Sequence, residues 1–173
     1  MSDFPFTAQM GVVYNHPLVR LLIGVPMVIG AMLLGGLFWE KLWGAPTSHP
    51  LGELLNSLVL AGLAMLAYAA YVRWVERRPV SEFGRPGAVR EWAVGVALGF
   101  GAITLTVAVI AALGGYRITG WNPPSVLVPV LALAIFSGIF EEIIARGLVF
   151  RLLEQWLGSW TALALSALLF GFL

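Results

Sequence analysis

The 173-residue chain is 60% hydrophobic and only 11% charged, with a mean hydropathy of +0.90, whereas soluble domains have about 45–50% apolar and about 25% charged residues. Its net charge of +1 lacks the basic excess of a nucleic-acid-binding protein. It has no cysteine, which excludes disulfides, thiolate nucleophiles and cysteine-ligated metals. We therefore predict an all-α, polytopic transmembrane helix bundle whose main partner is the lipid bilayer.

Apolar runs predict about five membrane-spanning helices, because about 20 apolar residues are needed to cross a bilayer core of about 30 Å. In chain order the runs cover residues 18–39, 54–75, 92–113, 126–140 and 160–173. The fourth run leads directly into Glu141, Glu142 and Arg146. A helix over the fifth run would be only about 21 Å long. We therefore expect this last helix to be truncated at Leu173.

The distribution of arginine predicts the orientation of the bundle, because cytoplasmic loops are enriched in Lys and Arg. The connection between the third and fourth runs has Arg117 as its only basic residue. The connection between the second and third runs contains or adjoins five arginines, namely Arg73, Arg77, Arg78, Arg85 and Arg90. We predict that this loop and the N-terminus are cytoplasmic in a multi-pass protein of the inner or plasma membrane. Glu141, Glu142 and Arg146 then lie toward the cytoplasmic side.

Glu141, Glu142 and Arg146 form the one concentrated polar feature that adjoins a predicted span. Glu142 and Arg146 are four residues apart and are expected to pair on one helix face. Glu141 is rotated by about 100° from Glu142, so it is left for chemistry and suits a general base that activates water. The alternative is a helix end at which all three side chains are merely solvated. Arg151 and Glu154 are expected to form a surface pair or to reach lipid headgroups.

The remaining residue types exclude several hydrolytic mechanisms. An aspartyl protease needs two aspartates, but Asp3 is the only one. The H-E-x-x-H zinc motif is absent. His16 and His49 each precede a proline, and we predict plain loop roles for both. A serine protease needs a base, and the serines Ser57, Ser137 and Ser166 have no intramembrane histidine in this chain to serve as one. A glutamate-dependent hydrolase, a transporter with an ionisable site and a non-catalytic immunity or scaffold protein stay open.

Residues 141–147, with the sequence E-E-I-I-A-R-G, resemble the E-E-x-x-x-R motif of the CPBP family. This family comprises CAAX-prenyl-protease-type and bacteriocin-processing (Abi) intramembrane proteases. The likeness extends over residues 76–173. Phe170 fits the first residue of the family's second motif, F-x-x-x-H, whose histidine would fall one position past Leu173. Ala145 departs from the Phe that members often carry there.

The resemblance implies a glutamate-dependent membrane peptidase that acts on a membrane-associated peptide or protein. Glu141 would activate water together with the second-motif histidine, while Glu142 and Arg146 would order the site and Phe170 would support it. The glutamate mechanism requires no cofactor; a divalent metal has been supposed for the family, but ligands for it are not evident in this chain. The resemblance also divides the chain into membrane helices over 1–125, with a loop near 76–91, and the start of a protease core over 126–173. The 173-residue form is expected to be inactive without the missing histidine motifs.

Overall fold

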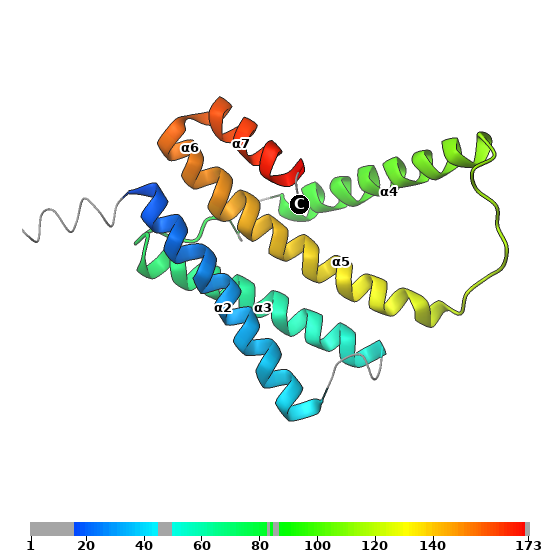
Figure 1. Cartoon of the computed structure of the whole chain (residues 1–173), viewed down its shortest axis with the longest axis horizontal. Coiled ribbons are helices and arrows are strands. Elements are labelled where there is room, and N and C mark those ends of the chain that lie inside the picture. Colours follow the sequence, from blue (N-terminus) through cyan, green and yellow to red (C-terminus); the bar gives the residue numbers. More distant parts are fainter. Residues whose placement is uncertain (1–15, 45–49, 83, 85–86, 172–173) are drawn as a thin grey trace, which may run out of the picture. The chain divides into compact units, whose positions relative to one another are not determined.

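A computed structural model describes residues 16–44, 50–82, 84 and 87–171, and all its regular elements are helical (Figure 1). Three long helices come first: α2 (Pro17–Trp43), α3 (Pro50–Trp74) and α4 (Ala88–Ala112). A 3₁₀ turn, η2 (Pro124–Val126), then leads into α5 (Leu127–Glu142), the π-helix η3 (Ile143–Phe150), α6 (Arg151–Leu157) and α7 (Ser159–Gly171). The all-α prediction is confirmed.

Four helices are long and apolar enough to cross a membrane: Pro17–Trp43, Pro50–Trp74, Ala88–Ala112 and the continuous helix Pro124–Leu157. The continuous helix has 34 residues and joins η2, α5, η3 and α6. It ends at Gly158, whose φ of 79° lies in the left-handed region that glycine adopts readily. Arg146 is therefore followed by further helical turns, so the charged motif lies within the helix and not at its end. The fifth predicted span corresponds to the shorter apolar helix α7.

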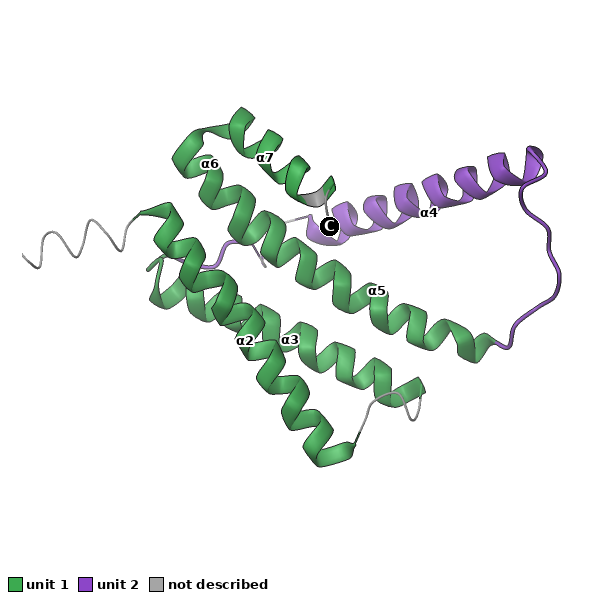
Figure 2. Ribbon diagram, viewed as in Figure 1, with its two compact units in different colours: residues 1–78, 124–173 green, residues 79–123 purple. Residues whose placement is uncertain are grey.

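The described chain divides into two compact units (Figure 2). One comprises residues 1–78 and 124–173, and within it α3 packs against both α2 and α5, while α2 also contacts η3 and α6. The other comprises residues 79–123 and contains α4, which buries none of its residues. The sequence-based division after residue 125 rests on motifs and stays a prediction.

Small and aromatic residues form the core of the first unit. Five alanines are buried where helices meet, namely Ala61, Ala64, Ala67, Ala132 and Ala162. Small side chains let membrane helices approach closely, so that dispersion contacts replace the missing hydrophobic driving force. Tyr68 and Tyr71 of α3 and Leu148 of η3 fill the remaining space, each at most 1% exposed.

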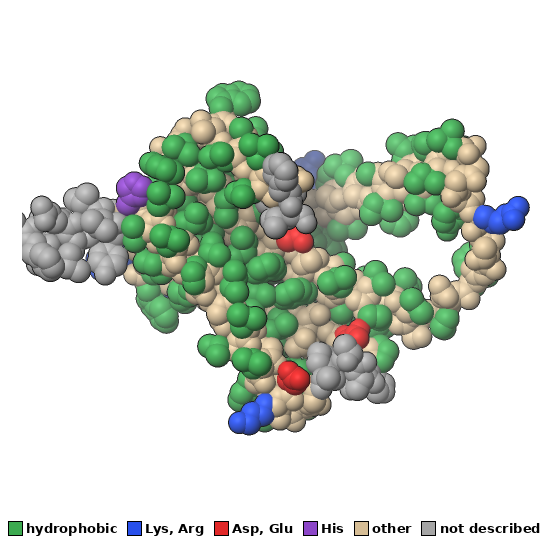
Figure 3. Space-filling model, in the orientation of Figure 1, with side chains coloured by type: hydrophobic (Ala, Val, Ile, Leu, Met, Phe, Trp, Pro, Cys, Tyr) green, Lys and Arg blue, Asp and Glu red, His purple; other side chains and the backbone are tan. Residues whose placement is uncertain are grey.

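Large apolar side chains cover much of the outer surface (Figure 3). Leu22, Leu33 and Leu34 of α2, for example, are each more than 60% exposed. Water would disfavour such a surface at about 25 cal/mol per Å², whereas lipid tails match it. The protein is therefore a multi-pass membrane protein in contact with the bilayer.

Gly24 of α2 lies against Leu148 of η3 and the Tyr71 ring of α3. A Cβ atom at this position would lie 2.9 Å from Leu148 Cδ2 and 3.0 Å from the Tyr71 ring, both of which belong to fully buried side chains. We expect Gly24→Ala to destabilise the protein by about 1–3 kcal/mol through overpacking. Gly30→Ala on the same helix meets no atom within 4 Å and is the matched control. Thermal unfolding in detergent measures the difference, and equal midpoints for the two variants would contradict it.

Candidate active site

The charged motif lies where α5 changes into a π-helix. Glu141 and Glu142 are the last two residues of α5, and Arg146 lies inside η3. π-Helical turns are rare and occur frequently at functional sites. The residue types and their spacing in this segment are compatible with an ordinary α-helix, so the sequence gives no signal for the change of helix type.

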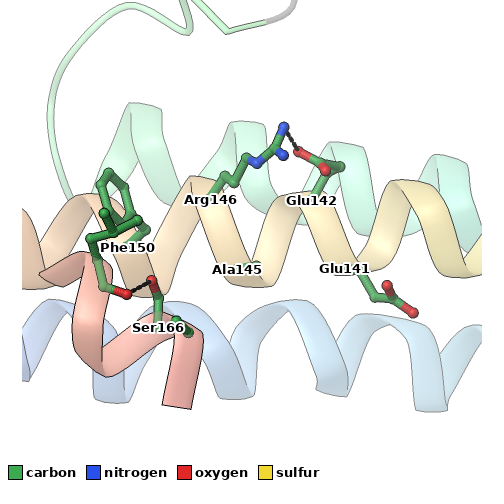
Figure 4. A pocket seen from close by; sticks show the side chains of 8 residues that line it. Glu141, Glu142, Ala145, Arg146, Phe150 and Ser166 are labelled. Carbon is green, nitrogen blue, oxygen red and sulfur yellow. Dashed lines mark hydrogen bonds and ion pairs between the residues drawn. The ribbon is translucent and has the colours of Figure 1, made fainter. Parts of the chain in front are cut away.

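The structure brings Glu142 and Arg146 together as the spacing predicted. Arg146 Nη1 lies 2.9 Å from Glu142 Oε2, and the two side chains are 78% and 57% exposed. Glu141 points away from this pair (Figure 4). Within the described residues no ion pair is formed by Glu141, so its carboxylate is not neutralised by Arg146.

A pocket of about 470 Å³ surrounds the motif (Figure 4). One wall comes from the motif helix and the other from α7, and the lining residues are Glu141, Glu142, Ala145, Arg146, Phe150, Leu163, Ser166 and Ala167. The polar groups of the motif therefore face an otherwise mainly apolar space. Ala145 contributes only a methyl group, which leaves room beside the carboxylates.

The α7 wall contains a polar group that the sequence did not assign to the site. The Ser166 hydroxyl donates a hydrogen bond to the Leu163 carbonyl at 3.0 Å, within the same helix. Its oxygen keeps the capacity to accept a hydrogen bond from a bound group. Phe170 lies further along α7, but its side chain is outside the described part of the chain.

A buried carboxylate connects the end of α3 to the motif helix. Glu76 is 1% exposed at its side chain and forms ion pairs with Arg78 at 2.7 Å and with Arg151 at 2.6 Å. The Tyr71 hydroxyl donates to the same carboxylate at 3.2 Å. The prediction that Arg151 pairs with Glu154 or reaches headgroups is therefore wrong; Glu154 instead accepts a hydrogen bond from the Ser159 hydroxyl at 2.6 Å.

The two arginines hold the pKa of Glu76 below its ordinary value. Burial by itself raises this pKa, but hydrogen bonds and charge attraction from Arg151 and Arg78 outweigh it. A carboxyl group with a depressed pKa stabilises the fold above its unfolded-state pKa, and this contribution is lost as the pH falls through the folded-state pKa. We expect the unfolding midpoint in detergent to fall on acidification below about pH 4.5, and to fall less in Glu76→Gln. Parallel pH profiles would contradict this assignment.

His16 is not among the residues that line the pocket. His16 caps α2, since its Nδ1 accepts a hydrogen bond from the Leu18 amide at 3.3 Å, and its ring meets Trp156 edge-on at 5.7 Å. His49 lies outside the described residues. In the described part of the chain, no three His, Asp or Glu side chains come together as a metal site requires. Glu141 and Glu142 alone do not complete a metal site there, and we derive no step through a metal.

Comparison with known families finds a match in the C-terminal part of the chain. Residues 123–173 match the family model described as Rce1-like: Type II CAAX prenyl endopeptidase Rce1-like. The matched range contains α5, η3, α6 and α7, and with them every residue that lines the pocket. Searches of curated proteins and of solved structures gave no match.

Proposed function

Because residues 123–173 form a Rce1-like type II CAAX prenyl endopeptidase family domain, we propose that this membrane protein is a glutamate-dependent endopeptidase. The observation that carries the proposal is the different environment of the two adjacent glutamates. Glu142 is paired with Arg146, whereas Glu141 lines the same pocket outside that pair. One carboxylate is thus available as a base, and an ion pair lies beside it to order the site.

In the proposed reaction Glu141 removes a proton from a water molecule in the pocket. The water oxygen bonds to the carbonyl carbon of the substrate, and the carbon–nitrogen bond then breaks as the proton passes to the leaving amine. A lone carboxylate is a weak catalyst for this reaction, so a second acid–base group and donors to the oxyanion are needed.

Helical register indicates where that second group would lie. Leu163 and Ala167 mark the face of α7 that lines the pocket. The histidine of F-x-x-x-H, four residues after Phe170, would be seven residues after Ala167 and eleven after Leu163. At about 100° per residue it falls within about 20° of both. In a chain that continued α7 past Leu173, a histidine at that position would therefore lie on the pocket face.

The pocket also suits a substrate of a particular chemistry. Its apolar lining, from Phe150, Leu163 and Ala167, favours a segment with apolar side chains or a prenyl group, held at the membrane. From the arginine-rich connection between α3 and α4 we propose that the site opens toward the cytoplasmic side. Cleavage of the substrate would then take place near the cytoplasmic side of the membrane.

Proteoliposomes that contain the protein test the function. We expect cleavage of a prenylated C-terminal CAAX-type peptide, measured by mass spectrometry. A transporter would give Glu141-dependent flux of a solute without cleavage products. Absence of cleavage with prenylated, unprenylated and leader-peptide substrates would reject the proposal in favour of a non-catalytic scaffold.

Arg146→Gln is expected to affect activity more than stability. The pair is largely exposed within the described structure, and exposed pairs contribute about 0–1 kcal/mol to stability. Without Arg146, however, Glu142 carries an uncompensated charge beside Glu141, and we expect the cleavage rate to fall about tenfold or more through misplaced groups. Arg117→Gln, an exposed arginine outside the pocket, is the control. A stability loss without a rate loss would contradict the role assigned to the pair.

A further inference from the structure

The buried carboxylate of Glu76 is linked to the motif helix through a short chain of polar contacts. Arg151 Nη2 donates to Glu76 Oε1 at 2.6 Å, and Arg151 Nε donates to the Gly147 carbonyl oxygen at 2.9 Å. The single guanidinium of Arg151 thus contacts a loop carboxylate that lies 75 residues earlier in the chain and a backbone carbonyl that lies four residues earlier. The fork geometry of arginine fixes both contacts at once.

A second arm of this network reaches the same carbonyl oxygen. The Tyr68 hydroxyl donates to Gly147 O at 3.4 Å, and Arg78 Nη2 in turn donates to the Tyr68 hydroxyl at 3.5 Å. Arg78 is held by Glu76 through its Nε at 2.7 Å. Both arms therefore begin at Glu76 and end at the residue that follows Arg146.

The loop that presents Glu76 adopts a conformation that needs this support. Arg77, between Glu76 and Arg78, has a φ of 55°, the only positive φ of a non-glycine residue in the described chain. The left-handed region costs an L-residue energy, so it persists where surrounding contacts enforce it. The reversal at Arg77 is what lets Arg78 fold back onto the Glu76 carboxylate.

Resting on the peptidase function proposed above, we propose that Glu76 is a positioning residue of the site, which sets the rotation of the π-helical turn carrying Arg146. A π-helix is less regular than an α-helix, so its geometry depends on external contacts. Tyr68 of α3 and Arg151 both donate to the Gly147 carbonyl in that turn, and Glu76 and Arg78 of the loop hold these two donors. The orientation of the Glu142–Arg146 pair, and thereby the space left for water at Glu141, follows from these contacts.

Two variants separate positioning from simple stability. Glu76→Gln removes the charge that holds both arginines. Arg151→Lys keeps the positive charge beside Glu76 but cannot contact Glu76 and the Gly147 carbonyl together through one planar fork. Glu40→Gln, an exposed carboxylate near the far end of α2, is the matched control. If Glu76→Gln fails to fold, Arg151→Lys decides the question.

Each variant is assayed twice in the full native chain. For folded protein we expect kcat to fall about tenfold or more with KM within about twofold, because misplaced reacting groups affect the chemical step. In a background without other cysteines, the alkylation rate of Ala145→Cys in the pocket reports geometry independently of catalysis. We expect this rate to change at least about threefold in Glu76→Gln and Arg151→Lys, and not in Glu40→Gln.

The two readouts distinguish failure of this inference from failure of the proposed function. If folded Arg151→Lys kept the native kcat and the native alkylation rate at position 145, the positioning role would be overturned. The same conclusion would follow if a lowered unfolding midpoint were the only effect of the substitution. If the native protein cleaves nothing but alkylation still changes, the positioning of the pocket holds and the peptidase function fails.

Discussion

Glu141→Gln should reduce peptide cleavage by about a hundredfold or more, because a positioned general base contributes about 10²–10⁴ in rate. The substitution keeps the shape of the side chain and removes its ability to accept a proton. Glu141 lies outside the Glu142–Arg146 ion pair, so the pair is retained in the variant. We therefore expect the unfolding midpoint to change by no more than an ordinary surface substitution allows, about 0.5 kcal/mol in stability.

The matched control is Glu91→Gln, another exposed glutamate on a long apolar helix but outside the pocket. Initial rates on one peptide in proteoliposomes, normalised to folded protein, measure the effect. The cleavage rate of Glu142→Gln should lie between the rates of Glu141→Gln and Glu91→Gln, since this substitution removes the partner of Arg146 but leaves Glu141. If Glu141→Gln retained the native rate while Glu142→Gln abolished it, the roles of the two carboxylates would be reversed.

The sequence predicted the features that depend on local pattern. Apolar runs predicted the positions of the four long helices, because length and hydropathy define a membrane span, although the fourth helix continues past the predicted end at Phe140 to Leu157. The spacing of Glu142 and Arg146 predicted their ion pair, because residues four apart share one face of a helix. The structure confirmed both.

The sequence did not predict the features that depend on distant contacts. The π-helix η3 has the same apolar composition as an α-helix, so no residue marks it. Arg151 has Glu154 as a neighbour at helical spacing, which made a local pair the natural prediction. Its partner is instead Glu76, because the chain reversal at Arg77 places that carboxylate against the motif helix. In the sequence, Glu76 is a loop glutamate followed by two arginines, which does not indicate a buried side chain. Its burial results from the packing of α3 against the motif helix.

Gly147→Ala should impair both folding and catalysis, since this glycine of η3 packs directly against Tyr68 of α3. A Cβ atom there would lie 3.0 Å from Tyr68 Cε2, 3.2 Å from Cζ and 3.4 Å from the hydroxyl oxygen. The ring has little freedom to move aside, because Tyr68 is 1% exposed and its hydroxyl bonds to the Gly147 carbonyl. Alanine gains up to about 1 kcal/mol in helix propensity, but overpacking costs about 1–3 kcal/mol. The net expectation is a loss of stability.

Gly138→Ala is the control that separates propensity from packing. Gly138 belongs to the same continuous helix, nine residues before Gly147, and a Cβ atom there meets nothing within 4 Å. Thermal unfolding in detergent should therefore place Gly138→Ala at or above the native midpoint and Gly147→Ala below it. Because the displaced Tyr68 also loosens one arm of the Glu76 network, the cleavage rate of folded Gly147→Ala should fall about tenfold or more. A Gly147→Ala variant with native stability and native rate would mean that α3 and the motif helix can move apart without consequence, and both the packing argument and the positioning argument would then be wrong.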